Sequence, residues 1–422
     1  MSALVFERSL PRFAAARVVS SFGSGRSAGI GPLRLVDRDA PVAPTEGWFH
    51  VDPVLSGICG SDLATLDGRS SRYFEDIVSF PFVPGHEVVG TVSEDAIGAD
   101  GAALPSGSRV VLQPVLGCVA RGIEPPCPAC QAGQVGNCGR IAFGHIRPGL
   151  QTGFCADTGG GWSTTGLVAH ASQLYAVPDD LSDADAVTTE PVACAVHAVL
   201  GAPIAEGDVV AVVGAGTVGL LVTAALHHLA SIGRCPTPSV VLVGARYAHQ
   251  QRLARELGCT EALPSDQLAR AVRRQSRSLS YGGSSGTTAT LSAGADVVID
   301  CVGSAESIAQ SIAMVRPRGT VSLVGMPGKV HVDLAPLWHR EVRLAGAYAY
   351  GTERARNGSD GAHDGVSTFS LAFDVVSAQR TGRLVTATYP LARFEEAVAH
   401  AGSAGRRGAV KIAFDVRKGS SR

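Results

Sequence analysis

The hydrophobic pattern of the chain changes near residue 195. From about residue 32 to 190, short apolar runs such as VGTVSE and SRVVLQPV are interrupted by glycine, proline and aspartate, which predicts a strand-rich region. After residue 195, runs typical of buried strands alternate with runs of helical spacing, namely GDVVAVVGAG, TVGLLVTAALHHLA, SVVLVGA and HQQRLARELG. ADVVIDCVG and GTVSLVG continue the series, so a parallel, doubly wound sheet is predicted up to about residue 350.

The end of the chain is predicted to return to the strand-rich region through the segments TYPLARFEEAVAHA and AVKIAFDV. We therefore expect an α/β protein in which residues 1–194 and 351–422 form one domain and residues 195–350 form the other. Two stretches rich in serine and glycine, near residues 277–294 and 353–365, are predicted to be mobile surface insertions without chemistry.

Composition excludes several classes of protein. The 422 residues include 36 Lys and Arg and 37 Asp and Glu, and a net charge of −1 creates no field that would attract nucleic acid or anionic lipid. Hydrophobic residues make up 45% of the chain, which is too apolar for disorder, yet no apolar run reaches the ~18 residues of a membrane span. Basic residues interrupt the apolar stretches of the N-terminal MSALVFERSLPRFAAAR, so no secretory signal is expected. These features predict a cytoplasmic protein that binds neither nucleic acid nor membrane.

A glycine-rich turn follows the first buried strand of the second region. Gly214, Gly216 and Gly219 form GAGTVG between a strand and a helix, with Thr217 and Val218 at the start of the helix. The first glycine permits a tight turn, the second lets the backbone approach a pyrophosphate, and the third permits close packing of helix on strand. The pattern predicts a dinucleotide site, and a glycine-rich turn without a ligand is the competing interpretation.

The end of the second buried strand indicates which dinucleotide binds. An NAD site usually has an acid there, but this chain has Gly244, Ala245 and Arg246. A small residue followed by arginine leaves room for a 2′-phosphate and can pair with it, so NADP is predicted in preference to NAD. The competing interpretation is that Arg246 is a solvated surface residue.

A group of cysteines indicates a structural metal site. Cytosolic thiols stay reduced, so the ten cysteines are unlikely to form disulfides and can bind metal. Cys127, Cys130 and Cys138 have the spacing C-x2-C-x7-C in a loop rich in glycine and proline, which suits a tetrahedral zinc ion. The fourth ligand is either Cys118, nine residues before Cys127, or Glu124. Unmetallated surface cysteines are the remaining alternative.

A second metal site is indicated by three residues that lie far apart in the sequence. Cys59 and His86 each stand beside glycine at the edge of an apolar segment, and each alone would more often be a core residue. Glu190 interrupts an apolar run, where an uncompensated carboxylate is costly to bury. Together the three suit a catalytic zinc, which has three protein ligands and an open position. Spacing alone does not show that they converge.

The motifs GICGSDL, PGHEVVG, EPVACAVHAV, VVGAGTVGLL and DCVGSAES, with the cysteine loop, occur in an order that resembles the zinc-containing medium-chain alcohol and polyol dehydrogenases. The resemblance covers nearly the whole chain. It implies a GroES-like, β-rich catalytic domain built from both chain ends and a Rossmann domain between them. It also implies two zinc ions per chain, and hydride transfer between an alcohol or carbonyl substrate and a nicotinamide cofactor.

The resemblance assigns roles to individual residues. It implies that Cys59, His86 and Glu190 hold the catalytic zinc, as in the sorbitol and glucose dehydrogenase branch. Asp62 matches the acid that orients the ligating histidine, and Ser61 matches the hydroxyl that receives the substrate proton. The matched neighbour that can approach the zinc is Glu87, and the cofactor is expected to contact Cys301, Val302, Gly303, Val324, Gly325, Met326 and Lys411.

The chain departs from the family pattern at two positions. Ala64 replaces a histidine that ends the proton relay in many relatives, so the proton must leave through water or the ribose. Glu124 stands where the family loop has its first cysteine, so a four-thiol site depends on Cys118. Tyr73, Phe74 and Trp162 could line a substrate pocket, and core packing is the alternative for each.

Two other functions are compatible with the predicted fold. A non-catalytic nucleotide-binding protein could share it, because a fold alone does not imply an activity. A zinc-free quinone-type reductase would lack Cys59, His86 and the cysteine loop, which this chain has. The expected partner is a small-molecule alcohol or carbonyl substrate, and a homodimer or homotetramer is the expected assembly.

Overall fold

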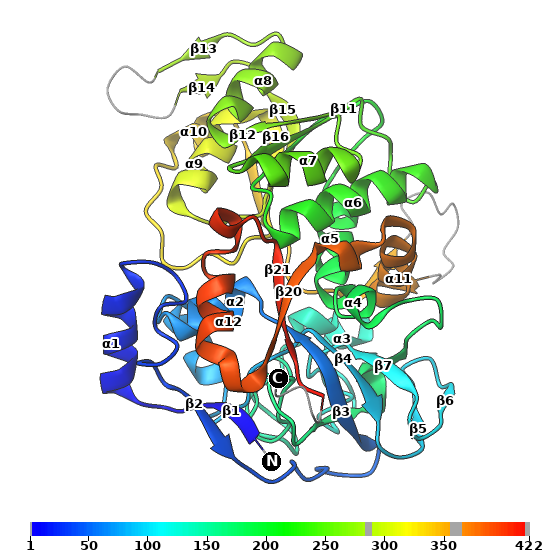
Figure 1. Cartoon of the computed structure of the whole chain (residues 1–422). Coiled ribbons are helices and arrows are strands. Elements are labelled where there is room, and N and C mark those ends of the chain that lie inside the picture. The colour runs from blue at the N-terminus through cyan, green and yellow to red at the C-terminus, as the bar shows by residue number, and fades with distance from the viewer. Residues whose placement is uncertain (1, 283–288, 355–364, 418–422) are drawn as a thin grey trace. The chain divides into compact units, whose positions relative to one another are not determined.

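The computed structural model describes residues 2–282, 289–354 and 365–417 (Figure 1). The chain forms two compact units, which we call unit 1 (Met1–Glu190, Tyr350–Thr352 and Ala372–Arg422) and unit 2 (Pro191–Ala349 and Glu353–Leu371). The sequence placed the return to the first domain at residue 351, whereas the structure assigns Glu353–Leu371 to unit 2. One reason is that the Glu353 carboxylate contacts His197 Nδ1 at 2.7 Å and accepts a hydrogen bond from Thr368 Oγ1 at 2.8 Å, all within unit 2.

Unit 1 is built around a seven-stranded sheet. Its strands are β3 (Trp48–Gly57), β4 (Val88–Val92), β7 (Arg109–Leu112), β8 (Leu167–His170), β9 (Leu174–Ala176), β20 (Val385–Pro390) and β21 (Lys411–Asp415). They lie in the order β20-β21-β3-β4-β7-β9, and β8 pairs with β3. β20 and β21 are parallel and the remaining pairs are antiparallel. The pairing of β21 with β3 returns the C-terminal segment to this unit.

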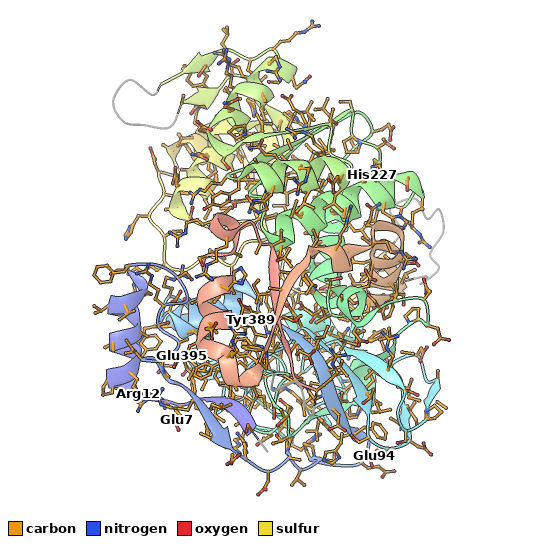
Figure 2. All side chains as sticks on the ribbon, viewed as in Figure 1. Glu7, Arg12, Glu94, His227, Tyr389 and Glu395 are labelled. Carbon is orange, nitrogen blue, oxygen red and sulfur yellow. The ribbon has the colours of Figure 1, made fainter. Side chains whose placement is uncertain are left out.

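Shorter elements surround that sheet. The strands are β1 (Ser2–Phe6), β2 (Leu33–Asp37), β5 (Ala96–Ile97) and β6 (Ala103–Leu104), and the helices are α1 (Leu10–Ser20), α2 (Gly60–Leu66), α3 (Pro128–Gln131), α4 (Asp183–Ala186) and α12 (Phe394–Ala401). Trp162 is fully buried, packs edge-on against Phe414, and donates from Nε1 to Gly57 O at 3.2 Å. Trp162 is therefore a core residue. Glu94 is a charged residue at the surface of this unit (Figure 2), where it accepts a hydrogen bond from the backbone N–H of His50.

Unit 2 contains the predicted doubly wound sheet. Its strands are β10 (Val209–Val213), β11 (Val240–Ala245), β12 (Glu261–Pro264), β15 (Ala295–Asp300), β16 (Val315–Leu323) and β17 (Arg343–Gly346). All pairs are parallel, in the order β12-β11-β10-β15-β16-β17. The helices of the unit are α6 (Thr217–Ser231), α7 (Ala248–Glu256), α8 (Leu268–Gln275), α9 (Ala305–Met314) and α10 (Ala335–His339).

The strand order explains where a ligand of unit 2 would lie. The chain runs outward from β10 to β12, then returns to the other side of β10 with β15, so the order reverses between β10 and β15. Ligands of such sheets bind at this switch point, beyond the carboxyl ends of the strands. The turn between β10 and α6 carries the glycines of GAGTVG at that end. The predicted α/β fold class is confirmed.

Two helices and two hairpins complete the fold. α5 (Thr189–Gly201) and α11 (Thr368–Gln379) span the residues at which one unit ends and the other begins. β13 (Ser280–Tyr281) pairs with β14 (Thr290–Leu291), and β18 (Thr352–Arg354) with β19 (Gly365–Ser367). Residues 283–288 and 355–364 of the two predicted insertions lie outside the described residues. No helix within the described part of the chain has the length and apolar character to cross a membrane.

Candidate active site and metal centres

Three potential metal ligands of unit 1 come together at the sheet. Cys59 follows β3 and is the N-cap residue of α2, while His86 and Glu87 directly precede β4. Because β3 and β4 are antiparallel neighbours, the end of one strand lies beside the start of the other. One ligand atom from each of these three residues lies within 4.8 Å of those of the other two. A thiol, an imidazole and a carboxylate at this separation form a donor set that suits zinc.

Asp62 links two of these ligands. Its Oδ2 accepts a hydrogen bond from the backbone N–H of Cys59 at 2.9 Å, and its Oδ1 lies 3.5 Å from His86 Nδ1. Burial alone lowers the pKa of His86, but the adjacent Asp62 carboxylate more than compensates, so that pKa is raised well above its ordinary value. A carboxylate on Nδ1 leaves Nε2 as the nitrogen available to a metal, which is the arrangement expected from the sequence.

Glu87 forms a buried ion pair with Lys411 on β21. Both side chains are almost completely buried, and Lys411 Nζ also donates to Ile58 O at 3.2 Å. Burial lowers the pKa of Lys411, but the Glu87 carboxylate outweighs it and raises that pKa above its ordinary value. Gly57 makes this approach possible, because a Cβ there would lie 1.8 Å from Glu87 Oε2 and 2.8 Å from Lys411 Cε. The family resemblance implied that Lys411 contacts the cofactor. Its partner in unit 1 is Glu87, and the cofactor contact stays a prediction.

Glu190, the predicted third ligand, is not part of the group within 4.8 Å. It lies at the start of α5, is buried, and interacts electrostatically with His86, Glu87 and Lys411. Burial raises the pKa of Glu190 to about 7, opposed by His86, Lys411 and a hydrogen bond with Tyr350. Glu190 is therefore a further buried carboxylate near these three residues, and Tyr350 is a neighbour that the sequence did not indicate.

The remaining polar group predicted here is Ser61, in the first turn of α2. Its side chain is half-buried, and no described residue forms a hydrogen bond with its hydroxyl. Ala64, one turn later, has only a methyl group and cannot continue a proton relay. Tyr73 is exposed and stacks edge-on against Phe74, so the described contacts do not make Tyr73 part of an enclosed pocket.

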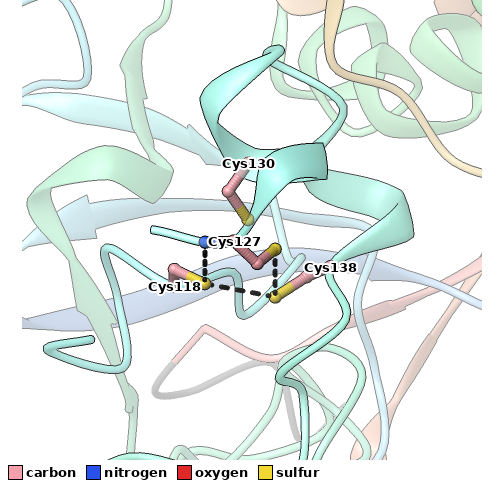
Figure 3. Close-up of side chains that lie close together, drawn as sticks. All are labelled: Cys118, Cys127, Cys130 and Cys138. Carbon is pink, nitrogen blue, oxygen red and sulfur yellow. Dashed lines mark hydrogen bonds between the residues drawn. The ribbon is translucent and has the colours of Figure 1, made fainter. Parts of the chain in front are cut away.

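The four cysteines gather in one place (Figure 3). Cys118 Sγ lies 3.6 Å from Cys138 Sγ, and Cys127 Sγ lies 3.9 Å from Cys138 Sγ. One zinc ion with Zn–S bonds of about 2.3 Å in a tetrahedron requires sulfur atoms about 3.8 Å apart. The observed separations fit that geometry. Glu124, the alternative ligand, is exposed and outside the group, which we call the cysteine quartet (Cys118, Cys127, Cys130 and Cys138).

Local turns aim the quartet's thiols at one another. Cys127 caps the short helix α3, which contains Cys130, and its backbone N–H points to Cys118 Sγ at 3.3 Å. Although burial raises the pKa of Cys127, hydrogen bonds from the backbone N–H groups of Cys130 and Gly139 lower it to about 6. Burial raises the pKa of Cys130 and of Cys138. Three buried thiols and one half-buried thiol at this separation would be stabilised together as thiolates by a divalent ion.

The turn after β10 in unit 2 has the geometry of a dinucleotide site. Gly214 has φ +89°, a left-handed conformation that glycine adopts without strain. A Cβ on Gly219 would lie 1.9 Å from Gly214 O, so the helix packs directly on the turn, whereas the space around Gly216 is open. Gly216 caps the 15-residue helix α6, which begins with Thr217 and Val218 and whose N-terminal N–H groups suit an anion.

Two further loops of unit 2 carry the residues expected at the nicotinamide. Asp300, at the end of β15, is fully buried, and its Oδ1 accepts hydrogen bonds from the N–H groups of Val302 and Gly303. Its carbonyl oxygen accepts from Val324 and Gly325, which joins the two loops. Val302 and Met326 are exposed, and Cys301 is partly so. Sequence reasoning missed Asp300, although an acid at the end of a buried apolar strand was a visible signal.

The end of β11 lacks an acid, as the sequence indicated. Ala245 is the last residue of the strand and is buried, and its carbonyl accepts a hydrogen bond from Gln251 Nε2 at 3.3 Å. Arg246 follows and is exposed, and no described carboxylate pairs with its guanidinium. The end of β11 therefore has a positively charged side chain, Arg246, next to the small side chain of Ala245.

Comparison with known proteins identifies the family. The model described as "Alcohol dehydrogenase GroES-like domain" matches residues 45–179, and the one described as "Zinc-binding dehydrogenase" matches residues 218–361. A protein of Agrobacterium fabrum assigned as a D-xylulose reductase is 30% identical over 332 residues, covering 76% of this chain and 82% of that protein. L-idonate 5-dehydrogenase of Vitis vinifera is 28% identical over 315 residues, covering 73% and 76%.

Solved structures share the fold. Alcohol dehydrogenase TADH from Thermus sp. ATN1 superposes with a TM-score of 0.64 at 24% identity, over 99% of this chain and 100% of that one. A protein of Sinorhizobium meliloti assigned as a zinc-binding dehydrogenase and solved with NADP gives 0.63 at 24% identity, over 93% and 98%. With the sequence matches, they lead to one conclusion: this chain belongs to the zinc-type medium-chain alcohol and polyol dehydrogenases and is an oxidoreductase of that family.

Proposed function

We propose that this enzyme interconverts a secondary hydroxyl of a polyol or sugar acid and the matching ketone, with NADP(H) as the preferred cofactor and two zinc ions per chain. The group of Cys59, His86 and Glu87, whose ligand atoms lie within 4.8 Å of one another, is the observation that carries the proposal. The substrate class is supported by the names of the relatives, which act on D-xylulose and L-idonate. We expect the reaction to occur in the cytoplasm, where thiols remain reduced.

The chain's own residues support a proton transfer beside the metal ligands. A zinc ion at this site would supply a Lewis acid that favours loss of the substrate's hydroxyl proton, and the nicotinamide would accept the hydride. Cys59 and His86 would hold the metal, and Asp62 fixes the orientation of His86. Ser61 presents a hydroxyl that no described residue engages, so it can accept the proton. Because Ala64 has only a methyl group, the proton would then leave through water or the cofactor ribose.

Two carboxylates compete for the third ligand position. Glu87 belongs to the close group and is bound by Lys411, while Glu190 is buried nearby and bonded to Tyr350. We propose that Glu190 completes the metal site. Lys411 already neutralises the Glu87 carboxylate, whereas His86 and Lys411, the positively charged groups near Glu190, each also interact with another carboxylate. The cysteine quartet would hold the second zinc.

Elemental analysis combined with an activity screen tests this proposal. After dialysis the protein should retain two zinc ions per chain and should change nicotinamide absorbance with polyols or their ketones. A protein with one zinc or none would contradict the metal assignment. A protein with two zinc ions but no turnover on polyols, sugar acids or simple alcohols would contradict the substrate class. Light scattering after size exclusion would measure whether the predicted homodimer or homotetramer forms.

Substitutions at the end of β11 test the cofactor preference. A charge-assisted hydrogen bond contributes roughly 1.5–3 kcal/mol, so kcat/KM should favour NADP over NAD by about ten- to a hundredfold. Arg246→Ala should remove most of this preference by weakening NADP use alone, and Ala245→Asp should favour NAD by giving the ribose hydroxyls an acceptor. The kinetics should be measured at one ionic strength, because Arg246 is exposed and screened by salt. A wild-type enzyme that uses NAD as well as NADP would contradict the assignment.

A further inference from the structure

A buried arginine lies beside the cysteine quartet. Arg121 is fully buried, three residues after Cys118 on the same turn, and its backbone N–H donates to Gly117 O and Cys118 O. Among the described residues, its guanidinium donates hydrogen bonds only to backbone carbonyls, those of Leu116, Phe143, Ile146, Arg147 and Gly149, at 2.5 to 3.3 Å. Arg121 therefore joins the segment just before the quartet's first cysteine to the segment that follows its last.

The charge of this guanidinium lacks an adjacent carboxylate. Among the described residues, no Asp or Glu oxygen lies within 4 Å of Arg121, and its electrostatic neighbour Asp157 is already paired with Arg147. Burial lowers the pKa of Arg121, and the groups that oppose this effect are the thiols of Cys155, Cys138 and Cys118, followed by Asp157. Two of those three thiols belong to the quartet.

The quartet has the opposite charge when it is loaded. Four thiolates around one divalent ion carry a net charge of −2, and buried charge is costly unless a counter-charge lies nearby. We infer that Arg121 is the counter-cation of the cysteine quartet, a positioning residue that offsets its negative charge while fixing residues 143–149 against it. This inference rests on the proposed metal occupancy of the quartet.

Arg340 in unit 2 shows what an arginine does without such a site. It is also buried and donates to the carbonyls of Ile312, Leu291 and Val315. Its electrostatic neighbour is the hydroxyl of Tyr281, and no thiol is among the groups that act on it. Both arginines join segments through carbonyl groups, so loss of either should destabilise its own unit. Only substitution of Arg121 should change the zinc affinity of the quartet.

The test uses zinc release to a chromogenic chelator in the full-length Cys59→Ser background, where the quartet holds the remaining zinc. Arg121→Gln removes the charge but keeps amide donors, and Arg121→Lys keeps the charge but loses the planar fork. Arg340→Gln and Arg340→Lys are the matched controls. We expect the apparent zinc affinity to fall about ten- to a hundredfold in Arg121→Gln, and less than about threefold in Arg121→Lys and in both controls. Melting temperatures should fall in all four variants.

Two results would overturn the inference. One is equal zinc affinity in Arg121→Gln and Arg340→Gln, which would make Arg121 a structural arginine only. The other is a tenfold loss in Arg121→Lys, and this variant decides the question alone if Arg121→Gln does not fold. A failure of the proposed quartet site itself would look different, because the Cys59→Ser parent would then contain no zinc before any change at Arg121.

Discussion

The two groups of potential metal ligands in unit 1 differ in how the chain assembles them. The cysteine quartet comes from 21 consecutive residues, Cys118 to Cys138, and local turns hold its four like donors. The other group, Cys59, His86 and Glu87, which we call the mixed group, joins the segment after β3 to the segment before β4 and offers a thiol, an imidazole and a carboxylate. Four thiols close a tetrahedron, whereas a mixed set with an ambiguous third ligand leaves room for a substrate. Locally assembled ligands suit a structural role, and ligands assembled by the sheet suit catalysis.

The largest effect should follow from removing the thiol of the mixed group. Cys59→Ser should lose one zinc ion per chain and lower kcat by about a thousandfold or more, because the Lewis acid contributes several kcal/mol to the barrier. The melting temperature should change little, since Cys59 is partly exposed and its loop is held by Asp62. Zinc content, steady-state rates and thermal melting give the three readouts. Full activity in this variant would remove the distinction between the two groups.

A smaller effect is expected at the quartet, where substitutions should lower the melting temperature more than the reaction rate. Cys118→Ser and Cys130→Ser should each lose the other zinc ion and lower the melting temperature by roughly 5–10 °C, because metal binding there is part of folding. Glu124→Gln is the matched control and should leave zinc content and melting unchanged, because Glu124 is exposed and outside the quartet. If Glu124→Gln lost the zinc and Cys118→Ser kept it, the fourth ligand would be the carboxylate.

The smallest effect should follow from changing Asp62, the residue that orients His86. Asp62→Asn keeps the shape of the side chain but removes the charge that faces His86 Nδ1. The mixed site should lose about ten- to a hundredfold in zinc affinity, while the quartet keeps its metal. Competition with a chelator, followed for the two zinc ions separately, measures the zinc affinity of each site. Equal weakening of both ions would indicate general unfolding of unit 1 and not a specific support of His86.

The sequence predicted features that depend on local pattern. The buried runs of unit 2 form the parallel sheet that was predicted, because continuous apolar strands and the glycines after β10 are local signals. The spacing of Cys127, Cys130 and Cys138 likewise indicated one loop. The position of Glu87 beside Cys59 and His86 depends on the register of β3 against β4. It also depends on the pairing of β21 with β3, which places Lys411 there. Residues more than 300 positions apart leave no spacing signal, so the pair of Glu87 with Lys411 was not predictable.

Positions 57 and 60, on either side of Cys59, should differ strongly in the substitutions that they tolerate. The N–H of Gly57 donates to Glu87 O, and its missing side chain is the space that the Glu87 carboxylate fills. Gly60, three residues later and beside the ligand Cys59, has nothing within 4 Å of an added Cβ and begins a helix. In a saturation library, position 60 should accept alanine, which favours helix formation, while position 57 should accept glycine only. The strictest requirement near the candidate metal site thus falls on a residue that has no side chain.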